Sequence, residues 1–384
     1  MRRGGEGEGR VQRMSRAVRF DTESSAWLLT RHADCVTVLG DRRFSAELGQ
    51  GRRRRVDSLP TSMLNTDPPA HRRLRAPAAP LVAQARVRRC NKQVAAAAEH
   101  FANEAATRGE VDAITCYAAP IAAVTLATLL GVPPAELRTF TRLARAAAIN
   151  LNPLVDGPTA IRGKDAAAEL VEYLRAVIVK RRVTADGGIA ALAGLDGLTR
   201  RSQPETHGSS LDETLATLAL VVVGGFEPLV HLIGNGLDTL LRWPDQLDRL
   251  RTDPELWPMA IDELLRWESP IPFTARVCKT DATVDGQCIR TGDMVVALLA
   301  AGNRDPATFT DPEKVDVGRF PNPMLAFGAG PHVCLAVPLA RAVGRIALAT
   351  VLDRFRTITL LNDQPAWRDC MVPRGLVELP IRIG

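Results

Sequence analysis

The sequence predicts a mainly α-helical fold with a small β-rich part (α+β). Three observations predict it: Ala-rich amphipathic stretches dominate from Pro69 to Thr252, short β-like runs take over after Pro270, and no internal repeat or clear linker divides the chain. We therefore expect residues 17–384 to form a single domain. Residues 1–16, rich in Gly, Arg and Glu, are expected to be a disordered tail.

The expected elements follow in order along the chain. A strand from Ala26 to Arg31 precedes a helix that runs through Val38 to a turn at Asp41. Apolar periodicity then predicts helices, with breaks at prolines and paired glycines, near residues 84–107, 114–131, 134–149, 159–183 and 211–242. Short strands are expected over residues 274–278, 282–285, 294–299 and 376–383.

Composition narrows the class of protein. The chain is 46% hydrophobic and 24% charged, which is typical of a soluble globular protein. It has no stretch of 18 or more apolar residues, and its N-terminus carries Arg and Glu instead of a signal sequence. We therefore expect a cytoplasmic protein with no membrane contact. Seven cysteines and six histidines are dispersed without CxxC or HExxH motifs, which argues against disulfides or a zinc site.

The positive charge does not indicate a nucleic-acid partner. The net charge is +6 and Arg52 to Arg55 form a basic run, but few aromatic residues are available to stack on bases. The other basic residues are spread along the whole chain. We interpret the run as a solvated loop and expect no nucleic-acid binding.

The most informative segment is Phe327-Gly328-Ala329-Gly330-Pro331-His332-Val333-Cys334. A glycine-rich turn delivers one cysteine to the start of an apolar helical stretch, where backbone N–H groups stabilise a negative sulfur. Gly328 and Gly330 let the backbone lie flat against a broad ligand, which a Cβ would prevent. A flat ligand whose metal takes one axial cysteine thiolate is a haem.

This segment resembles the haem-binding loop of the cytochrome P450 family, Phe-Gly-x-Gly-x-His-x-Cys-x-Gly, with Ala336 in the last glycine position. The resemblance implies a bacterial, soluble cytochrome P450. Haem b (iron protoporphyrin IX) would lie between the long distal helix and the cysteine-loop helix, with Cys334 as its axial ligand and Phe327, Gly328, Gly330 and Ala336 against it. Bacterial members usually carry a further helix and strand before Ala26, so we expect a shortened N-terminal edge or a different start.

Two further motifs match the resemblance. Glu263 and Arg266 lie at i, i+3 on one helix face, and in the family such a pair locks with an arginine before the cysteine loop, here Arg319. This network is expected to be structural. His71 and Arg75 also share a helix face and match the family's haem-propionate contacts. Arg276 and His332 match a third and a fourth contact.

The expected distal helix departs from the family pattern Ala/Gly-Gly-x-Asp/Glu-Thr. It reads Gly224-Gly225-Phe226-Glu227-Pro228, so Pro228 stands where a hydroxyl would help deliver protons. A mid-helix proline costs about 3 kcal/mol and removes the N–H that would bond the Gly224 carbonyl. We expect Gly224, Gly225, Glu227 and Pro228 to form the catalytic groove.

The missing threonine leaves several interpretations open. A substrate hydroxyl or a water can replace it, the chemistry can be coupling or rearrangement, or the enzyme can use peroxide. Peroxygenases of the family carry a proline here after an arginine that holds a fatty-acid carboxylate, and Glu227 in that position disfavours the fatty-acid version. Alternatively, Pro228 only adjusts a kink while Glu227 relays protons.

The resemblance also indicates the pocket. Ile271, Phe273 and Ala275, which follow Pro270, are expected to line it together with Phe226. The segment from Leu151 to Gly157 looks like a mobile lid.

The function implied is that of a haem-thiolate monooxygenase that hydroxylates or epoxidises a hydrophobic small molecule in secondary-metabolite biosynthesis. Dioxygen and electrons from a ferredoxin and ferredoxin reductase would drive it. A P450 with atypical chemistry (oxidative coupling, rearrangement or peroxide-driven oxidation) is one alternative, and a non-catalytic haem-binding protein is another. We expect a monomer.

Overall fold

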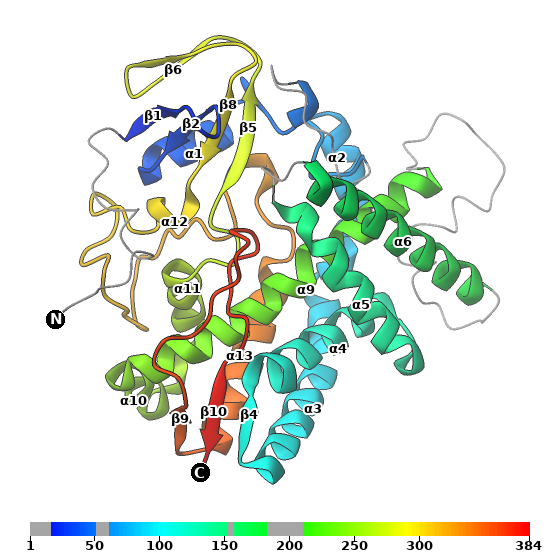
Figure 1. Cartoon of the computed structure of the whole chain (residues 1–384), viewed down its shortest axis with the longest axis vertical. Helices are drawn as coiled ribbons and strands as arrows, with labels where there is room; N and C mark the ends of the chain where they lie inside the picture. Colours follow the sequence, from blue (N-terminus) through cyan, green and yellow to red (C-terminus); the bar gives the residue numbers. More distant parts are fainter. Residues whose placement is uncertain (1–16, 51–60, 153–156, 183–209) are drawn as a thin grey trace.

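The computed structural model describes residues 17–50, 61–152, 157–182 and 210–384, and helices dominate it (Figure 1). The longer helices are α1 (His32–Gly40), α3 (Gln84–Arg108), α4 (Ala119–Leu130), α5 (Leu137–Ala147), α6 (Gly157–Arg182), α9 (Leu211–Arg242), α10 (Pro244–Thr252), α11 (Trp257–Trp267) and α13 (Val337–Arg354). Shorter ones are α2 (Ala70–Arg75), α12 (Leu299–Gly302), and the short 3-10 or π segments η1 (Leu48–Gln50), η2 (Ala76–Val82), η3 (Ile114–Ala118), η4 (Pro134–Glu136), η5 (Ala148–Leu151), η6 (Pro254–Leu256) and η7 (Gly330–His332).

Strands of the described residues form three small sheets. The largest has the order β1-β2-β8-β5-β3 and joins β1 (Val18–Asp21), β2 (Ala26–Leu29) and β3 (Phe44–Ser45) to β5 (Thr274–Cys278) and β8 (Met294–Ala297). Among the described strands, only β2 and β8 pair in parallel, with Ala26 opposite Met294. The second sheet joins β4 (Glu110–Asp112), β10 (Pro380–Ile383) and β9 (Ile358–Leu360), and the third joins β6 (Ala282–Val284) and β7 (Gln287–Ile289).

The predicted fold class is confirmed, and the differences lie at short elements. The helix expected near 114–131 is divided into the π turn η3 and α4, and the strand expected over 376–383 is limited to β10. Strands β1, β3, β4, β7 and β9 were not predicted, because segments of two to four residues carry too little periodicity and are decided by their pairing partners. The expected disordered tail, residues 1–16, lies outside the described residues.

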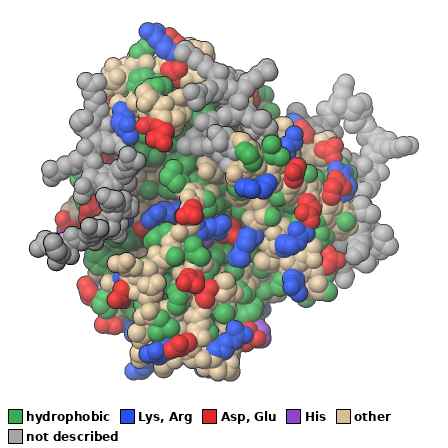
Figure 2. Space-filling model, viewed as in Figure 1, with side chains coloured by type: hydrophobic (Ala, Val, Ile, Leu, Met, Phe, Trp, Pro, Cys, Tyr) green, Lys and Arg blue, Asp and Glu red, His purple; other side chains and the backbone are tan. Residues whose placement is uncertain are grey.

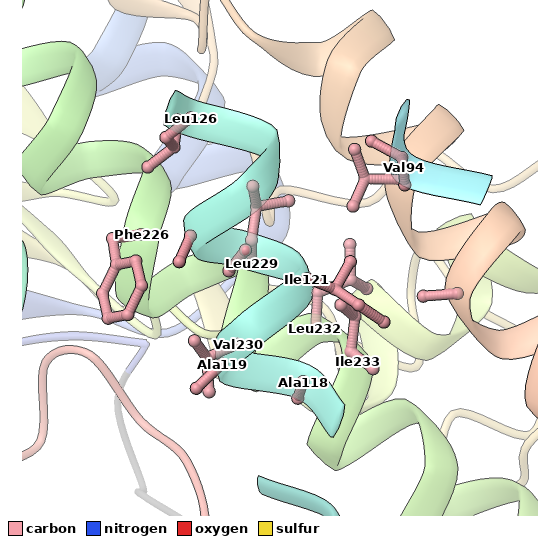
Figure 3. Close-up of a cluster of buried hydrophobic side chains, with 14 of the residues drawn as sticks. Val94, Ala118, Ala119, Ile121, Leu126, Phe226, Leu229, Val230, Leu232 and Ile233 are labelled. Atoms are coloured by element: carbon pink, nitrogen blue, oxygen red, sulfur yellow. The ribbon is translucent and has the colours of Figure 1, made fainter. Parts of the chain in front are cut away.

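Helix α9 is the centre of the hydrophobic core. Figure 3 shows its side chains Phe226, Leu229, Val230, Leu232 and Ile233 packed against α4, and Val94 of α3 lies nearby. Ser210 and Glu213 form a capping box that starts the helix. By length and composition α9 could cross a membrane, although it contains no uninterrupted apolar run of 18 residues. Because 78% of its most apolar window is buried in the protein, core packing accounts for this composition.

The surface shows no separation of charge on the face seen in Figure 2. Lys and Arg side chains are interspersed there with Asp and Glu over the helical part of the molecule. The basic run Arg52 to Arg55, which we interpreted as a solvated loop, lies outside the described residues.

Candidate active site

One interior cavity collects most of the residues expected to act. It has a volume of about 370 Å³ and is lined mainly by apolar side chains from α9, the β5 region, the turn η5 and the segment before α13. The expected site residues that line this cavity are Arg75, Gly224, Gly225, Pro228, Ile271, Phe273, Ala275, Arg276, Phe327, Gly328, His332, Cys334 and Ala336.

The cysteine loop presents Cys334 to this cavity. The loop closes on itself because the Cys334 N–H donates to the Phe327 carbonyl at 2.9 Å, and α13 begins three residues later, at Val337. Burial raises the pKa of the Cys334 thiol, whereas the Ala336 N–H and the Arg75 guanidinium lower it. A coordinated metal ion reverses this balance, since a coordinating thiol is deprotonated outright.

Gly330 shows why the loop needs glycine. Its φ is +69°, and a Cβ there would lie 2.2 Å from the Leu39 carbonyl oxygen at the end of α1. Gly328 has a φ of +70° but nothing within 4 Å of its Cβ position, and it lines the cavity. One glycine therefore permits close packing on α1, and the other keeps space open on the cavity side.

Of the four residues expected to contact an anionic ligand, Arg75, Arg276 and His332 line the cavity, whereas His71 does not line it but packs against His332. The His71 and His332 ring centroids lie 4.2 Å apart, Arg276 reaches the site from β5, and Arg75 donates to the Val333 carbonyl at 2.8 Å. Burial, followed by the charge of Arg276, lowers the pKa of His332 to about 3. Burial also lowers the pKa of Arg276, to about 10.

These side chains fit the propionates and the metal of a haem. Both ring nitrogens of His71 are buried and have no hydrogen-bond partner among the described residues. Buried polar groups are rarely left unpaired, so the site needs an acceptor such as a carboxylate. Two guanidinium groups favour anions, and the thiol of Cys334 lines the same cavity. The donor set therefore matches a flat, anionic, thiolate-ligated cofactor.

A buried ion-pair network supports the approach to the loop. Arg266 donates to both Glu263 oxygens at 2.7 and 2.9 Å, and Arg319 donates to Glu263 Oε2 at 3.0 Å. Glu263 is 0% and Arg266 1% exposed. Arg266 also donates to the Asn303 carbonyl, and the Asn303 side chain accepts the Leu325 N–H at 2.6 Å. The network thus reaches the chain two residues before Phe327.

Helix α9 is continuous through Pro228 and turns one face to the cavity. That face includes Pro228 together with Gly224 and Gly225, which precede it by four and three residues and so share a side of the helix with it. Gly224 is exposed, and a Cβ there would meet no atom within 4 Å. The groove expected on this helix is therefore present, without a hydroxyl from α9.

Phe226 and Glu227 do not lie where the sequence predicted. Neither lines the cavity, and both are 0% exposed. Phe226 packs in the core beside Leu126 (Figure 3), and Glu227 is ion-paired with Arg145 and Arg368. The pattern misled because successive helical residues turn by about 100°, so positions 226 and 227 point away from the face of 224, 225 and 228.

Several residues at the site were not predicted. Asn65 and Asn150 line the cavity, and Asn303 connects the ion-pair network to the loop. His231 could have been found from its i, i+4 spacing to Glu227, but Arg145 and Arg368 carry no local signal. Of the predicted lid, Leu151 and Asn152 line the cavity, whereas residues 153–156 lie outside the described part.

Comparisons with known proteins agree on one family. The family model described as Cytochrome P450 matches residues 140–380. The chain is 34% identical over 377 residues to Cytochrome P450 107B1 of Saccharopolyspora erythraea, covering 94% of this chain and 89% of that protein. It is 30% identical to the polyketide biosynthesis cytochrome P450 PksS of Bacillus subtilis, covering 95% and 91%.

Solved structures show the same similarity. The chain superposes on P450BioI, solved in complex with an acyl carrier protein ligated to hexadec-9Z-enoic acid, with a TM-score of 0.86 and 28% identity over 96% of each chain. The solved structure of Bacillus subtilis PksS gives a TM-score of 0.85 at 29% identity and covers 96% of this chain and 94% of that one.

Replacing Arg319 by alanine tests the ion-pair network. Because the variant leaves the buried Glu263 carboxylate with one guanidinium fewer, we expect it to lower the free energy of unfolding by about 3 kcal/mol in urea denaturation. Arg249→Ala is the control, since it removes an arginine from the exposed pair with Asp316 and should cost less than about 1 kcal/mol. Equal losses in the two variants would contradict a special role for the network.

The Glu227 cluster predicts a loss of stability in acid. Burial opposes ionisation of Glu227, but the hydrogen bond from His231 and the charges of Arg368 and Arg145 outweigh it and lower its pKa from 4.5 to about 2. A carboxyl with a lowered pKa stabilises the fold above pH 4.5 and loses this contribution as the pH falls toward 2. The wild type should therefore lose about 3 kcal/mol more than Glu227→Gln between pH 5 and pH 2. Parallel pH profiles of unfolding free energy in the two proteins would refute this expectation.

Proposed function

This chain belongs to the cytochrome P450 family, and we propose from that premise that it is a haem-thiolate monooxygenase that hydroxylates or epoxidises a neutral hydrophobic small molecule. The family comprises oxidoreductases whose haem is ligated by a cysteine thiolate. One observation carries the proposal: Cys334 lines an interior apolar cavity together with Gly224, Gly225 and Pro228 of α9 and the cationic residues Arg75 and Arg276.

The cysteine loop and the cationic cluster would hold the cofactor. Cys334 would be the axial ligand of haem b, and Arg75, Arg276, His71 and His332 would bind its propionates. When bound, the haem supplies dioxygen activation, and the electron donation of the thiolate favours O–O cleavage. The roles of Glu263, Arg266 and Arg319 would be structural, since they hold the segment that leads into the loop.

The cavity favours a neutral, mainly aliphatic substrate. Among the described residues that line it, the only arginines, lysines and carboxylates are Arg75 and Arg276, which would be engaged by the propionates. Ile271, Phe273 and Leu151 supply apolar surface. A free carboxylate in the remaining space would have no cationic partner among the described lining residues, at a cost of several kcal/mol. Fatty acids are therefore disfavoured as substrates.

Proton delivery would depend on a mobile group. Pro228 has no hydroxyl and no N–H, and Gly224 faces open space in the cavity. The Gly224 carbonyl, which Pro228 cannot bond, can accept from a water or a substrate hydroxyl. Such a donor beside Gly224 and Gly225 would replace the threonine hydroxyl of the family pattern.

Atypical chemistry is the second candidate, and the proline at position 228 is the observation that favours it. Oxidative coupling, rearrangement or peroxide-driven oxidation would not need the usual proton-assisted step. Product yield with peroxide, compared with yield in the presence of a ferredoxin and its reductase, separates the candidates.

The primary proposal also includes electrons from a ferredoxin, a cytoplasmic location and a monomeric state. It further includes a role in secondary metabolism, which the polyketide-pathway relative supports.

The decisive experiment titrates the purified ferric protein with polyketides, terpenoids, cyclic peptides and fatty acids while its Soret band is recorded. One relative was solved with a loaded acyl carrier protein, so carrier-bound ligands belong in the panel. We expect a shift from low to high spin with neutral ligands, followed by product formation with ferredoxin and reductase. A shift with fatty acids alone would overturn the substrate class, and the absence of a thiolate-type carbon monoxide complex would overturn the haem-thiolate assignment. No product with any bound ligand would indicate a non-catalytic haem protein.

Changing Pro228 to threonine tests the meaning of the missing hydroxyl. If a mobile donor serves in its place, Pro228→Thr should raise the fraction of consumed electrons that appears in product severalfold, because a fixed hydroxyl is positioned better than a mobile one. Pro228→Ala is the matched control, since it restores the backbone N–H without adding a hydroxyl. Equal coupling in both variants would mean that the hydroxyl is irrelevant to this enzyme.

A further inference from the structure

Glu227 occupies an unusual place on the distal helix, one residue from the cavity face yet buried on another side. It is 0% exposed and does not line the cavity, whereas its neighbour Pro228 does. A buried carboxylate requires compensating charge and hydrogen bonds. The residues that provide them show what Glu227 does.

Each Glu227 oxygen contacts a cation from a different part of the chain. Arg145 Nε donates to Oε1 at 3.0 Å, and Arg368 Nη1 donates to Oε2. His231, one turn further along α9 and 1% exposed, places its Nε2 3.1 Å from Oε2. The ring of His231 is in turn packed closely by the C-terminal segment, since a Cβ at Gly375 would lie 1.8 Å from its Nδ1.

Arg145 connects Glu227 to one wall of the cavity. It lies in the last turn of α5, and the next turn, η5, carries Asn150 and Leu151 into the cavity lining, followed by Asn152. A shift of this turn would therefore move three lining residues together. The pair with Glu227 fixes the turn against α9.

Arg368 connects the same carboxylate to a second wall. It belongs to the segment 361–379 between β9 and β10, the red chain that crosses α9 in Figure 1. Four residues later, Val372 packs in one hydrophobic cluster with Ile271 and Phe273, both of which line the cavity. The Asn235 side chain of α9 also donates to the Arg374 carbonyl at 3.4 Å. Glu227 is thus the common partner of two segments that shape the cavity.

We propose that Glu227 is a positioning residue that sets the shape of the cavity by holding two parts of the chain against α9. These parts are α5 and residues 366–376, which lie within the segment between β9 and β10. In this role Glu227 does not pass protons into the cavity. The assignment rests on the proposed function only in taking this cavity to be where the substrate binds. The carboxylate is held by two arginines and a histidine, and it is not among the described residues that line the cavity.

The ionisation of Glu227 agrees with this assignment. Burial raises its pKa, but His231, Arg368 and Arg145 together lower it to about 2. Near neutral pH such a group carries no proton to give, and an efficient proton donor needs a pKa close to the working pH. The pKa of His231 is also lowered, in this case by burial itself, so this ring is the neutral member of the cluster.

The test compares Glu227→Gln and Arg145→Gln with Arg142→Gln in the haem-containing protein. Arg142 lies one turn before Arg145 on α5 but pairs with Glu169 at the surface, so its variant makes the same change of charge without touching α9. The probes are imidazole, which binds at the iron, and 1-octylimidazole, whose alkyl tail also contacts the cavity walls. We expect both cluster variants to weaken octylimidazole about tenfold and to leave imidazole unchanged, and Arg142→Gln to change neither.

Hydrogen–deuterium exchange identifies the walls that loosen. Glu227→Gln should speed exchange in both 137–152 and 366–376, whereas Arg145→Gln should do so only in 137–152, and Arg145→Lys should restore protection by keeping the charge. Unchanged exchange and octylimidazole affinity in Glu227→Gln, with slower turnover and a larger solvent deuterium isotope effect, would overturn the proposal in favour of a proton relay.

Two comparisons still test the role of Glu227 if one variant does not fold or if the protein takes up no haem. If Glu227→Gln does not fold, the comparison of Arg145→Gln with Arg145→Lys and Arg142→Gln still tests the pairing, because Arg145 is half-exposed. If the wild type takes up no haem, the imidazole titrations and the proposed function fail together, whereas the exchange comparison still decides whether Glu227 holds the two segments.

Discussion

The buried carboxylate of Glu263 is the constraint on which the site depends. It accepts from Arg266 on its own helix and from Arg319 in the segment before the cysteine loop, and Arg266 continues the network to the Asn303 carbonyl. Removing three charges from water costs several kcal/mol per ion unless each is paired and hydrogen-bonded. Residues 303–322 are held by these groups, because the carbonyls of Asn303, Pro312 and Lys314 accept from Arg266 and the Asn322 side chain donates to Glu263. The loop that follows therefore starts from a defined position, which is what a metal-binding thiol requires.

Helix α9 serves the core and the cavity at once. Most of its side chains pack against α4, α13 and neighbouring helices (Figure 3), whereas its glycine face borders the cavity. Gly225 also shows how tight this packing is, since a Cβ there would lie 2.9 Å from a Leu126 methyl group. A cavity beside a well-packed helix can keep its shape because the core side resists movement.

Two adjacent residues of α9, Glu227 and Pro228, determine which polar groups this helix offers to the cavity. Pro228 removes the hydroxyl from α9, and Glu227 turns its carboxylate into a cluster with Arg145, Arg368 and His231. The described lining therefore includes no acidic side chain. In this interpretation, protons for the proposed reaction come from water or from the substrate, and the charged groups near the cavity act on its shape. Both features follow from two adjacent residues of one helix.

The sequence by itself determined the fold class, the long helices and the residues of the cysteine loop, because periodicity and short fixed spacings report contacts within a few residues. It also placed Glu263 with Arg266, which need only one helical turn. Tertiary structure decided the direction of Glu227, the core position of Phe226, and the arrival of Arg145, Arg368 and Asn303 at their partners. These contacts join residues 22 to 141 positions apart. No local pattern encodes such pairs, because the packing of whole helices and segments brings them together.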